Sequence, residues 1–196
     1  MTSDISVTDV KCQALILLAR AREGDEDAFA GLVRLHEVNV RRLAAGLLMD
    51  PAEAEDAAQE VFVRAWRSLG RFRGDSSFST WLHRIAVNHC RDLLRARARR
   101  RWLSWDGLVE ALGGREPAEA AGPADEATRG AEARDELNRL LGGLPPDHRA
   151  VLVLRELNGM SYAEIGETLG RSTDSVRALL RRAREAARHF SRPESV

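Results

Sequence analysis

The sequence predicts an all-α protein built from two small helical domains joined by a flexible linker. Apolar residues recur at helical spacing through residues 10–100 and again from Ala133. Between them, residues 103–131 are rich in alanine and glutamate and are interrupted by glycine and proline, which is typical of a linker. A length of 196 residues allows one domain or two small ones. The expected parts are an N-terminal segment with a first helix (1–24), a first domain (25–101), the linker (102–132) and a second domain (133–196).

Start and stop signals define the elements of the first domain. A first helix ends near Gly24, and Asp25 is placed to cap the next one. Pro51 opens a third helix at its first turn, where the acids that follow suit the positive helix end. The turn residues of 72–78 break the helical pattern, and a further helix is expected over 79–100. The third helix has an apolar stripe opposite a polar face, which consists of Glu55, Asp56, Gln59, Glu60, Arg64 and Arg67.

The second domain carries the most specific local pattern. A helix is expected within Pro145–Gly159, and Ser161 and Glu164 then form a capping box at the start of a short helix that Gly170 stops. The pair Ser172-Thr173 can cap a long, arginine-rich helix. A short helix, a tight glycine turn and a second helix make a helix-turn-helix, whose second helix enters the major groove of DNA. The alternative is an ordinary three-helix bundle with an arginine-rich face.

Composition excludes several classes of protein. The chain is 44% hydrophobic, which excludes wholesale disorder. Its longest apolar run, Ala14 to Ala19, is far shorter than the roughly 20 residues that span a bilayer. The N-terminus is acidic and has no apolar segment behind a basic one, so we expect no secretory signal. Two cysteines are too few for a disulfide framework or a four-ligand metal site, and we expect reduced thiols, a cytoplasmic location and no cofactor.

A formal net charge of zero hides strong segregation of charge. All but one of the 30 basic residues are arginines, and they gather in two blocks, Arg84–Arg101 and Arg171–Arg192. Acidic residues dominate between Asp50 and Glu60 and again in the linker. The two basic blocks are either solvated faces of charged helices or two surfaces that bind polyanions such as nucleic acid.

Long stretches of both domains resemble one bacterial family. Residues 56–66, which read Asp-Ala-Ala-Gln-Glu-Val-Phe-Val-Arg-Ala-Trp, and residues 72–88 are similar to region 2 of the extracytoplasmic-function (ECF) sigma factors of the sigma-70 family. Residues 144–166 and 176–185 resemble their region 4. The resemblance implies a non-catalytic initiation subunit of RNA polymerase that recognises the −10 and −35 promoter elements and helps open the duplex. It also implies control by an anti-sigma factor, as is frequent in the family.

The resemblance assigns a docking face for core RNA polymerase to the third helix. In the family, this polar face docks on a coiled coil of the largest polymerase subunit, and the flap region is a further expected contact. The residues concerned here are Asp56, Gln59, Glu60 and Arg64. A carboxylate-rich face suits a basic partner helix, whereas without the resemblance it would be interpreted as a solvated helix face.

The loop that follows Phe72 resembles the family element that captures a base flipped out of the −10 strand. Gly74 lets the backbone approach closely, and the polar side chains beside it can bond a base edge. Phe78 and Trp81 either stack on a base or simply pack in the core. The expected −10 contacts are Arg73, Gly74, Asp75, Ser76, Ser77, Phe78, Trp81, Arg84, Asn88, Arg91 and Arg95.

The expected −35 contacts lie at the start of the basic helix, where side chains meet base edges, and along its arginines, which meet phosphates. They are Arg171, Ser172, Thr173, Ser175, Arg177, Arg181, Arg182 and Arg184. The chain departs from the family here: Asp174-Ser175-Val176 stands where a Gly-Thr-Val-like triplet is usual, Ala178 where a small hydroxyl residue is frequent, and Gly166 where alanine is usual. These departures bear on which −35 sequence is recognised.

Two other classes of function compete with this interpretation. A conventional transcriptional regulator would bind duplex DNA tightly by itself and would not need polymerase. An enzyme such as a nuclease would need clustered acids with histidine at metal-ligand spacing or a glycine-rich phosphate loop, and the five histidines are scattered. We therefore expect neither catalytic residues nor a metal site.

Overall fold

The computed structural model describes residues 7–105 and 136–190, with side chains described for residues 13–100 and 136–189. Within these ranges the chain forms helices joined by turns and contains no strand, which confirms the all-α prediction. None of the helices in the described ranges combines the length and apolar character needed to cross a bilayer.

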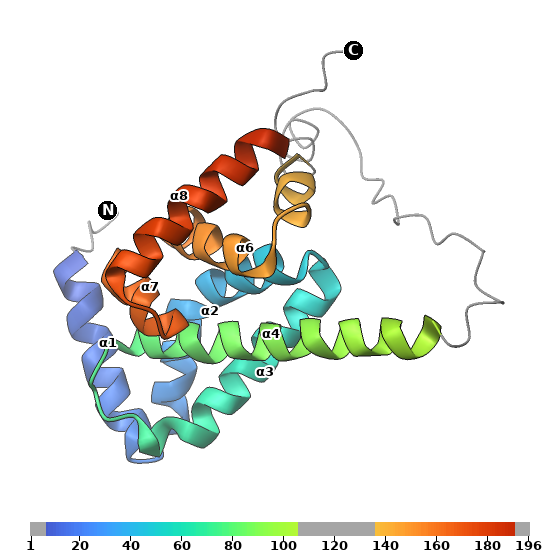
Figure 1. Cartoon of the computed structure of the whole chain (residues 1–196). Coiled ribbons are helices and arrows are strands. Elements are labelled where there is room, and N and C mark those ends of the chain that lie inside the picture. The colour runs from blue at the N-terminus through green and yellow to red at the C-terminus, as the bar shows by residue number, and fades with distance from the viewer. Residues whose placement is uncertain (1–6, 106–135, 191–196) are drawn as a thin grey trace, which may run out of the picture.

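Four helices form the N-terminal domain. They are α1 (Val7–Arg22), α2 (Glu26–Leu48), α3 (Pro51–Ser68) and α4 (Phe78–Trp105), with the short 3₁₀ turn η1 (Leu69–Arg71) after α3. Helix α2 is central, because it packs against α1, α3 and α4. The far end of α4 extends beyond the other helices (Figure 1).

Local signals in the sequence place these helices. Asp25 caps α2 by accepting a hydrogen bond from the backbone N–H of Ala28 at 2.9 Å, as predicted. Asp50 caps α3 in the same way through Glu53, and Pro51 occupies its first turn. The apolar stripes then meet in one core of fully buried side chains, among them Leu32, Val40, Leu43, Val61, Leu82 and Ala86.

The C-terminal domain contains the predicted helix-turn-helix. Helical residues 136–142 precede α6 (Pro146–Leu152), which continues as the π-helical turn η2 (Val153–Leu157) and is followed by α7 (Tyr162–Leu169) and α8 (Thr173–Phe190). The capping box of Ser161 and Glu164 is present at the start of α7. Gly170 ends α7 with a positive φ of 66°, a conformation that favours glycine.

The turn between α7 and α8 explains why Gly166 replaces the alanine that is usual in the family. The backbone N–H of Arg171 donates to the carbonyl oxygen of Gly166 at 2.9 Å. A Cβ atom on residue 166 would lie 2.6 Å from the carbonyl oxygen of Arg171, which is too close for a side chain. The tight turn therefore requires glycine in this chain.

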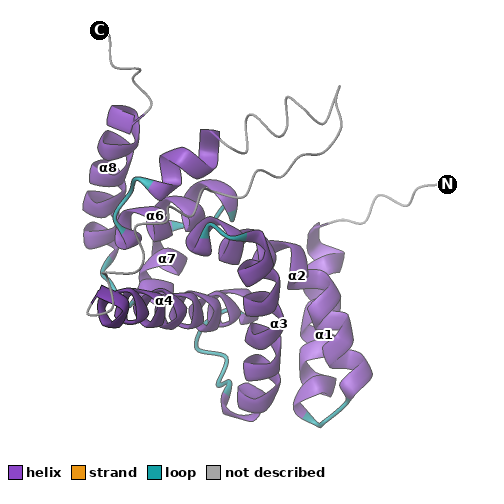
Figure 2. Ribbon diagram, turned by 90° about the vertical axis from the view of Figure 1, so that its right-hand side faces the viewer, coloured by secondary structure: helices purple, strands orange, loops and turns teal. Residues whose placement is uncertain are grey.

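The two domains pack against each other. Helix α7 lies along α4, and α6 and η2 contact α2 (Figures 1 and 2). Helix α4 continues through residues 102–105, where the linker was expected to begin, and the rest of the predicted linker lies outside the described residues. The domain boundaries set out above therefore remain a prediction.

Candidate nucleic-acid interface

An aromatic cluster holds the loop between η1 and α4. Phe72 and Phe78 are both buried, with ring centroids 6.0 Å apart in an edge-on arrangement. The ring of Trp81 lies 5.1 Å from that of Phe72 and 5.6 Å from that of Phe78. Because Phe78 packs in the core, the packing alternative describes its side chain in this structure. Its stacking on a base remains a prediction, whereas Trp81 is only half-buried.

The start of α4 fixes the other end of the loop. The hydroxyl oxygen of Ser77 accepts a hydrogen bond from the backbone N–H of Thr80 at 3.1 Å and pairs with the Thr80 hydroxyl at 2.8 Å. Ser77 is therefore engaged as a helix cap. Gly74 has a positive φ of 80°, so the loop turns there in a conformation that favours glycine.

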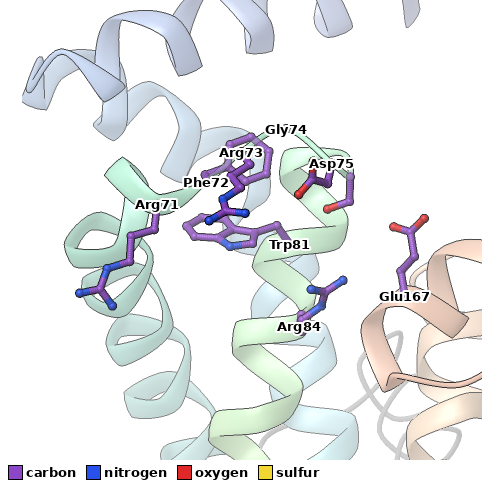
Figure 3. A pocket seen from close by; sticks show the side chains of 9 residues that line it. Arg71, Phe72, Arg73, Gly74, Asp75, Trp81, Arg84 and Glu167 are labelled. Atoms are coloured by element: carbon purple, nitrogen blue, oxygen red, sulfur yellow. The ribbon is translucent and has the colours of Figure 1, made fainter.

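A hollow of about 410 Å³ opens beside this loop (Figure 3). The indole of Trp81 lies under the loop, Arg84 reaches toward the hollow from α4, and Glu167 points toward it from α7. Three arginines and two carboxylates share the rim. The lining residues are Arg71, Phe72, Arg73, Gly74, Asp75, Ser76, Trp81, Arg84 and Glu167. Trp81 and most of the predicted loop residues thus meet at one site.

The remaining predicted −10 residues form a stripe along α4. Arg84, Asn88, Arg91 and Arg95 recur at helical spacing, which places them on one face. Arg84, Asn88 and Arg95 are exposed, and Arg95 pairs with Asp92 at 3.3 Å. Arg91 is less exposed, because its guanidinium donates to the carboxylate of Asp147 on α6 at 3.0 Å. The stripe therefore faces the C-terminal domain at Arg91.

Beneath this stripe, α4 buries titratable groups. Burial lowers the pKa of His83 from 6.5 to about 4, with a smaller lowering from His36 and an opposing effect of Glu164. In the described part of the chain, the Nδ1 atom of His83 has no hydrogen-bond partner. Burial likewise raises the pKa of the Cys90 thiol to about 12. Both groups are uncharged at neutral pH and serve as packing.

Helix α8 presents the predicted −35 residues. Val176, Leu179, Leu180 and Ala183 face the core, while Arg177, Arg181, Arg182 and Arg184 are exposed, as are Arg171 and Ser172. Thr173 and Ser175 are half-exposed. The hydroxyl of Ser172 accepts from the backbone N–H of Ser175 at 3.3 Å, so Ser172 caps the helix.

Several of these arginines already have acidic partners. Asp174, which would repel phosphate at the helix start, pairs with Arg177 at 2.8 Å. Arg184 pairs with Glu156 at 2.7 Å, and this hydrogen bond raises the pKa of Arg184. Both pairs are exposed, so their net contribution to stability is small and phosphate can replace the carboxylate.

The predicted polymerase-docking face lies on the exposed side of α3. Asp56, Gln59 and Arg64 are exposed and Glu60 is half-exposed. Arg64 donates to the carboxylate of Glu60 at 2.8 Å, which lowers the pKa of Glu60. Among the residues that the structure describes, Asp56 and Gln59 form no side-chain hydrogen bond or ion pair. Asp56 and Gln59 are thus available to a partner.

The same sequence matches two family models. Residues 32–100 match Sigma-70 region 2, and residues 134–186 match Sigma-70 region 4. The chain is 39% identical over 180 residues to the RNA polymerase sigma-H factor of Pseudomonas aeruginosa, a match that covers 87% of this chain and 89% of that protein. It is 37% identical over 177 residues to the ECF RNA polymerase sigma-E factor of Escherichia coli K12, covering 87% and 90%. The chain belongs to the ECF sigma factors of the sigma-70 family. A sigma factor is a non-catalytic initiation subunit that binds core RNA polymerase and promoter DNA.

Two solved structures, one of them of a sigma factor, have the same architecture. CnrH, in complex with the cytosolic domain of CnrY, superposes with a TM-score of 0.68 and 30% identity over 91% of this chain and 96% of that one. The sigma factor RpoE of Bartonella quintana, in complex with the anti-sigma factor NepR, superposes with a TM-score of 0.63 and 25% identity. This match covers 83% of this chain and 95% of that one. In the described ranges of this sigma factor, no cluster of metal-ligating side chains is present.

Sequence reasoning missed three residues at these surfaces. Glu167 lines the hollow, and Asp147 binds arginines of both domains. The guanidinium groups of Arg155 and Arg177 lie 5.0 and 6.0 Å from the centroid of the Tyr162 ring, so this ring contacts one of the predicted −35 residues. Of these three residues, only Tyr162 had a signal in the sequence, which was its position next to the capping serine. Glu167 and Asp147 had none, because their contacts join segments that are distant in the sequence.

Proposed function

We propose that this sigma factor directs promoter-specific initiation through three surfaces. Core polymerase docks on Asp56, Gln59, Glu60 and Arg64 of α3. The hollow under the loop 73–77 receives a base flipped from the −10 strand, with the α4 stripe along the phosphates. The outer face of α8 binds the −35 element. This sigma factor acts in the cytoplasm, where the polymerase is.

The hollow beside Trp81 carries the proposal. Unstacking a base costs a few kcal/mol, and one aromatic stack returns roughly 1–3 kcal/mol. The exchange is close to balanced, so arginine–phosphate contacts have to supply the remainder. Arg71, Arg73 and Arg84 line the same hollow and are placed to do so. A surface that combines two aromatic rings, of Phe72 and Trp81, with three arginines suits a single-stranded nucleic acid.

We further propose that an anti-sigma factor controls this protein. Two structural relatives are solved as complexes, one with the cytosolic domain of CnrY and the other with the anti-sigma factor NepR. The exposed α3 face and the DNA-facing surfaces are the natural targets of such an inhibitor, because covering either of them prevents initiation.

Run-off transcription with purified core polymerase and a genomic promoter library tests the proposed function. We expect defined transcripts only when the chain is added to core enzyme, and fewer from the Trp81→Ala variant. The matched control is Trp66→Ala, which removes an indole that contacts Phe29 outside the hollow. Absence of any defined start site would contradict the proposal. Tight binding of duplex promoter DNA by the chain alone would favour the conventional regulator.

A further inference from the structure

The C-terminal domain covers part of the face of α4 on which the proposed −10 contacts lie. Helix α7 packs along α4, and α6 and η2 pack on α2 (Figures 1 and 2). The two proposed DNA-binding surfaces therefore belong to domains that contact each other in this structure. On promoter DNA the two surfaces would lie apart, because the −10 and −35 elements occupy different positions along the duplex.

One carboxylate joins an arginine of each proposed DNA surface. Arg91 of the α4 stripe donates to Oδ1 of Asp147 at 3.0 Å, and Arg171, at the start of the recognition helix, donates to Oδ2 at 2.5 Å. Both are charge-assisted hydrogen bonds. Asp147 thus takes at one nitrogen of each arginine the place that a phosphate oxygen would take, so it competes with DNA phosphate for both arginines.

A second carboxylate of the C-terminal domain faces the −10 hollow. Glu167 of α7 lines it together with Trp81 and Arg84, which come from the other domain (Figure 3). A negative charge at this place attracts the surrounding arginines and repels an incoming phosphate. Helix α7 therefore places at the hollow the kind of charge that the nucleic acid would bring.

Backbone contacts complete the interface. Arg149 donates to the carbonyl oxygen of Leu47, and Arg42 donates in the opposite direction to that of Leu157, both at 3.0 Å. At the centre, Gly46 of α2 meets Val153 of η2 so closely that a Cβ atom on residue 46 would lie 2.8 and 3.0 Å from the two Val153 methyl groups. The packing at this point depends on the absence of a side chain.

We propose that the free chain is self-inhibited: the C-terminal domain closes over the −10 surface, with Asp147 and Glu167 standing in for DNA phosphates. The inference rests on the proposed function. Closure and −10 binding exclude each other, so the apparent affinity for DNA is reduced by the small fraction of open chains. Core polymerase, which docks on the uncovered α3 face, opens the chain when it holds the two domains apart.

The variant Gly46→Ala tests closure without changing charge. The added methyl group clashes with Val153 and separates the domains, whereas in an isolated helix the same substitution would be favourable. Energy transfer is measured between fluorophores on two introduced cysteines, Glu37→Cys on α2 and Glu185→Cys on α8. Both positions are exposed, and Cys12→Ser removes a competing thiol. The buried Cys90 does not react, because its thiol pKa is raised to about 12. We expect Gly46→Ala to lower energy transfer between the domains, and Val153→Ala in the same chain to restore it.

The variant Asp147→Asn tests the carboxylate and keeps the shape of the side chain. It should lower energy transfer and tighten binding of a labelled, mixed-sequence DNA single strand by between about twofold and thirtyfold, which is what two partly exposed ion pairs can produce. Asp92→Asn is the matched control, because Asp92 is an exposed acid on α4 whose ion pair, among the described residues, is with Arg95 of the same helix. We expect this control to leave both energy transfer and affinity close to wild type.

The two measurements separate failure of the inference from failure of the proposed function. Unchanged energy transfer in both Gly46→Ala and Asp147→Asn would overturn closure, and lower transfer without tighter DNA binding would overturn its inhibitory role. If Gly46→Ala does not fold, the surface variant Asp147→Asn decides alone. Transcription by core polymerase with the wild-type chain is read in parallel, and only its absence counts against the proposed function.

Discussion

Helices α3 and α4 belong to the same domain, and each presents a polar face, but the C-terminal domain contacts only the face of α4. On α3, Asp56 and Gln59 are exposed and form no side-chain hydrogen bond or ion pair among the described residues. On α4, Arg91 bonds Asp147, and Glu167 stands at the hollow. The difference shows that the residues of a helix determine what its face can bind. Contacts with the rest of the chain then determine whether that face is accessible.

The same comparison explains the balanced composition. The chain has 30 basic and 30 acidic side chains, and acids of one segment meet arginines of another. Asp147 bonds Arg91 and Arg171, and Glu156 bonds Arg184. Most of these pairs are partly exposed and contribute little to stability, so they can exchange for phosphate at low cost. On α3, Glu53 and Glu55 likewise pair with Arg97 and Arg41, whereas Asp56 forms no ion pair among the described residues.

The largest effect is expected at the open face. Replacing Gln59 and Glu60 together by alanine should weaken binding to core polymerase at least tenfold. The variant lacks a carboxylate and an amide that bond the polymerase, and their removal lowers the binding free energy by about 2 kcal/mol or more. Co-purification with core enzyme measures it. Glu37→Ala, which removes one exposed acid of α2, is the control. Unchanged co-purification of the double variant would refute this docking face.

The outer face of α8 should respond to salt. Replacing Arg181 and Arg182 by alanine should lower the slope of log affinity against log salt concentration by about 0.9 for each lost phosphate contact on duplex DNA. Titrations of −35 duplex at several salt concentrations measure the slope. The control replaces Arg22 and Arg34, two exposed arginines of α1 and α2. An unaltered slope in the α8 variant would count against phosphate contacts there.

Below the covered face, His83 should make stability depend on pH. Its pKa is about 4 in the folded chain and 6.5 when unfolded, so between these values the unfolded chain binds the extra proton. The free energy of unfolding therefore falls as pH drops below 6.5, by about 1.4 kcal/mol per pH unit for this group, or about 2 kcal/mol at pH 5. Urea unfolding at pH 7 and pH 5 should show a smaller drop for His83→Gln than for wild type. Equal drops would show that His83 is not held neutral.

The smallest effect is expected at the capping box. Ser161→Ala should lower the stability of the C-terminal domain by about 1 kcal/mol, because the backbone N–H of Glu164 loses its partner. Thermal unfolding measures it, and Ser68→Ala, on the other domain, is the control. Binding to core polymerase through α3 should stay unchanged. A loss of that binding would mean that the stability of the C-terminal domain and the α3 face are coupled through the fold.

Local features of the fold could be predicted from the sequence, and contacts between distant segments could not. The caps at Asp25 and Ser161 and the helix start at Pro51 depend on a few adjacent residues, and the structure confirms all three. The interface between the domains joins Arg149 to Leu47, which are 102 residues apart, so no periodicity indicates it. The resemblance to the family named the residues of the candidate site but not which of them meet.

Aromatic residues show the same limit on a smaller scale. Phe78 and Trp81 are separated by less than one helical turn, and the sequence allows both to stack on a base or to pack. In the structure Phe78 belongs to the core and Trp81 lines the hollow. Phe78 packs in the core because the rings of Phe72 and His36, which come from two other segments, lie against it.

A fluorescent base analogue in the −10 strand provides the most direct test of initiation by this sigma factor. Placed in a promoter found by run-off transcription, the analogue brightens when its base leaves the stack. The account predicts an increase with core polymerase and the chain together, a smaller one with Trp81→Ala, and none with the chain or core enzyme alone. No increase with both proteins present, or a full increase with the chain alone, would contradict it.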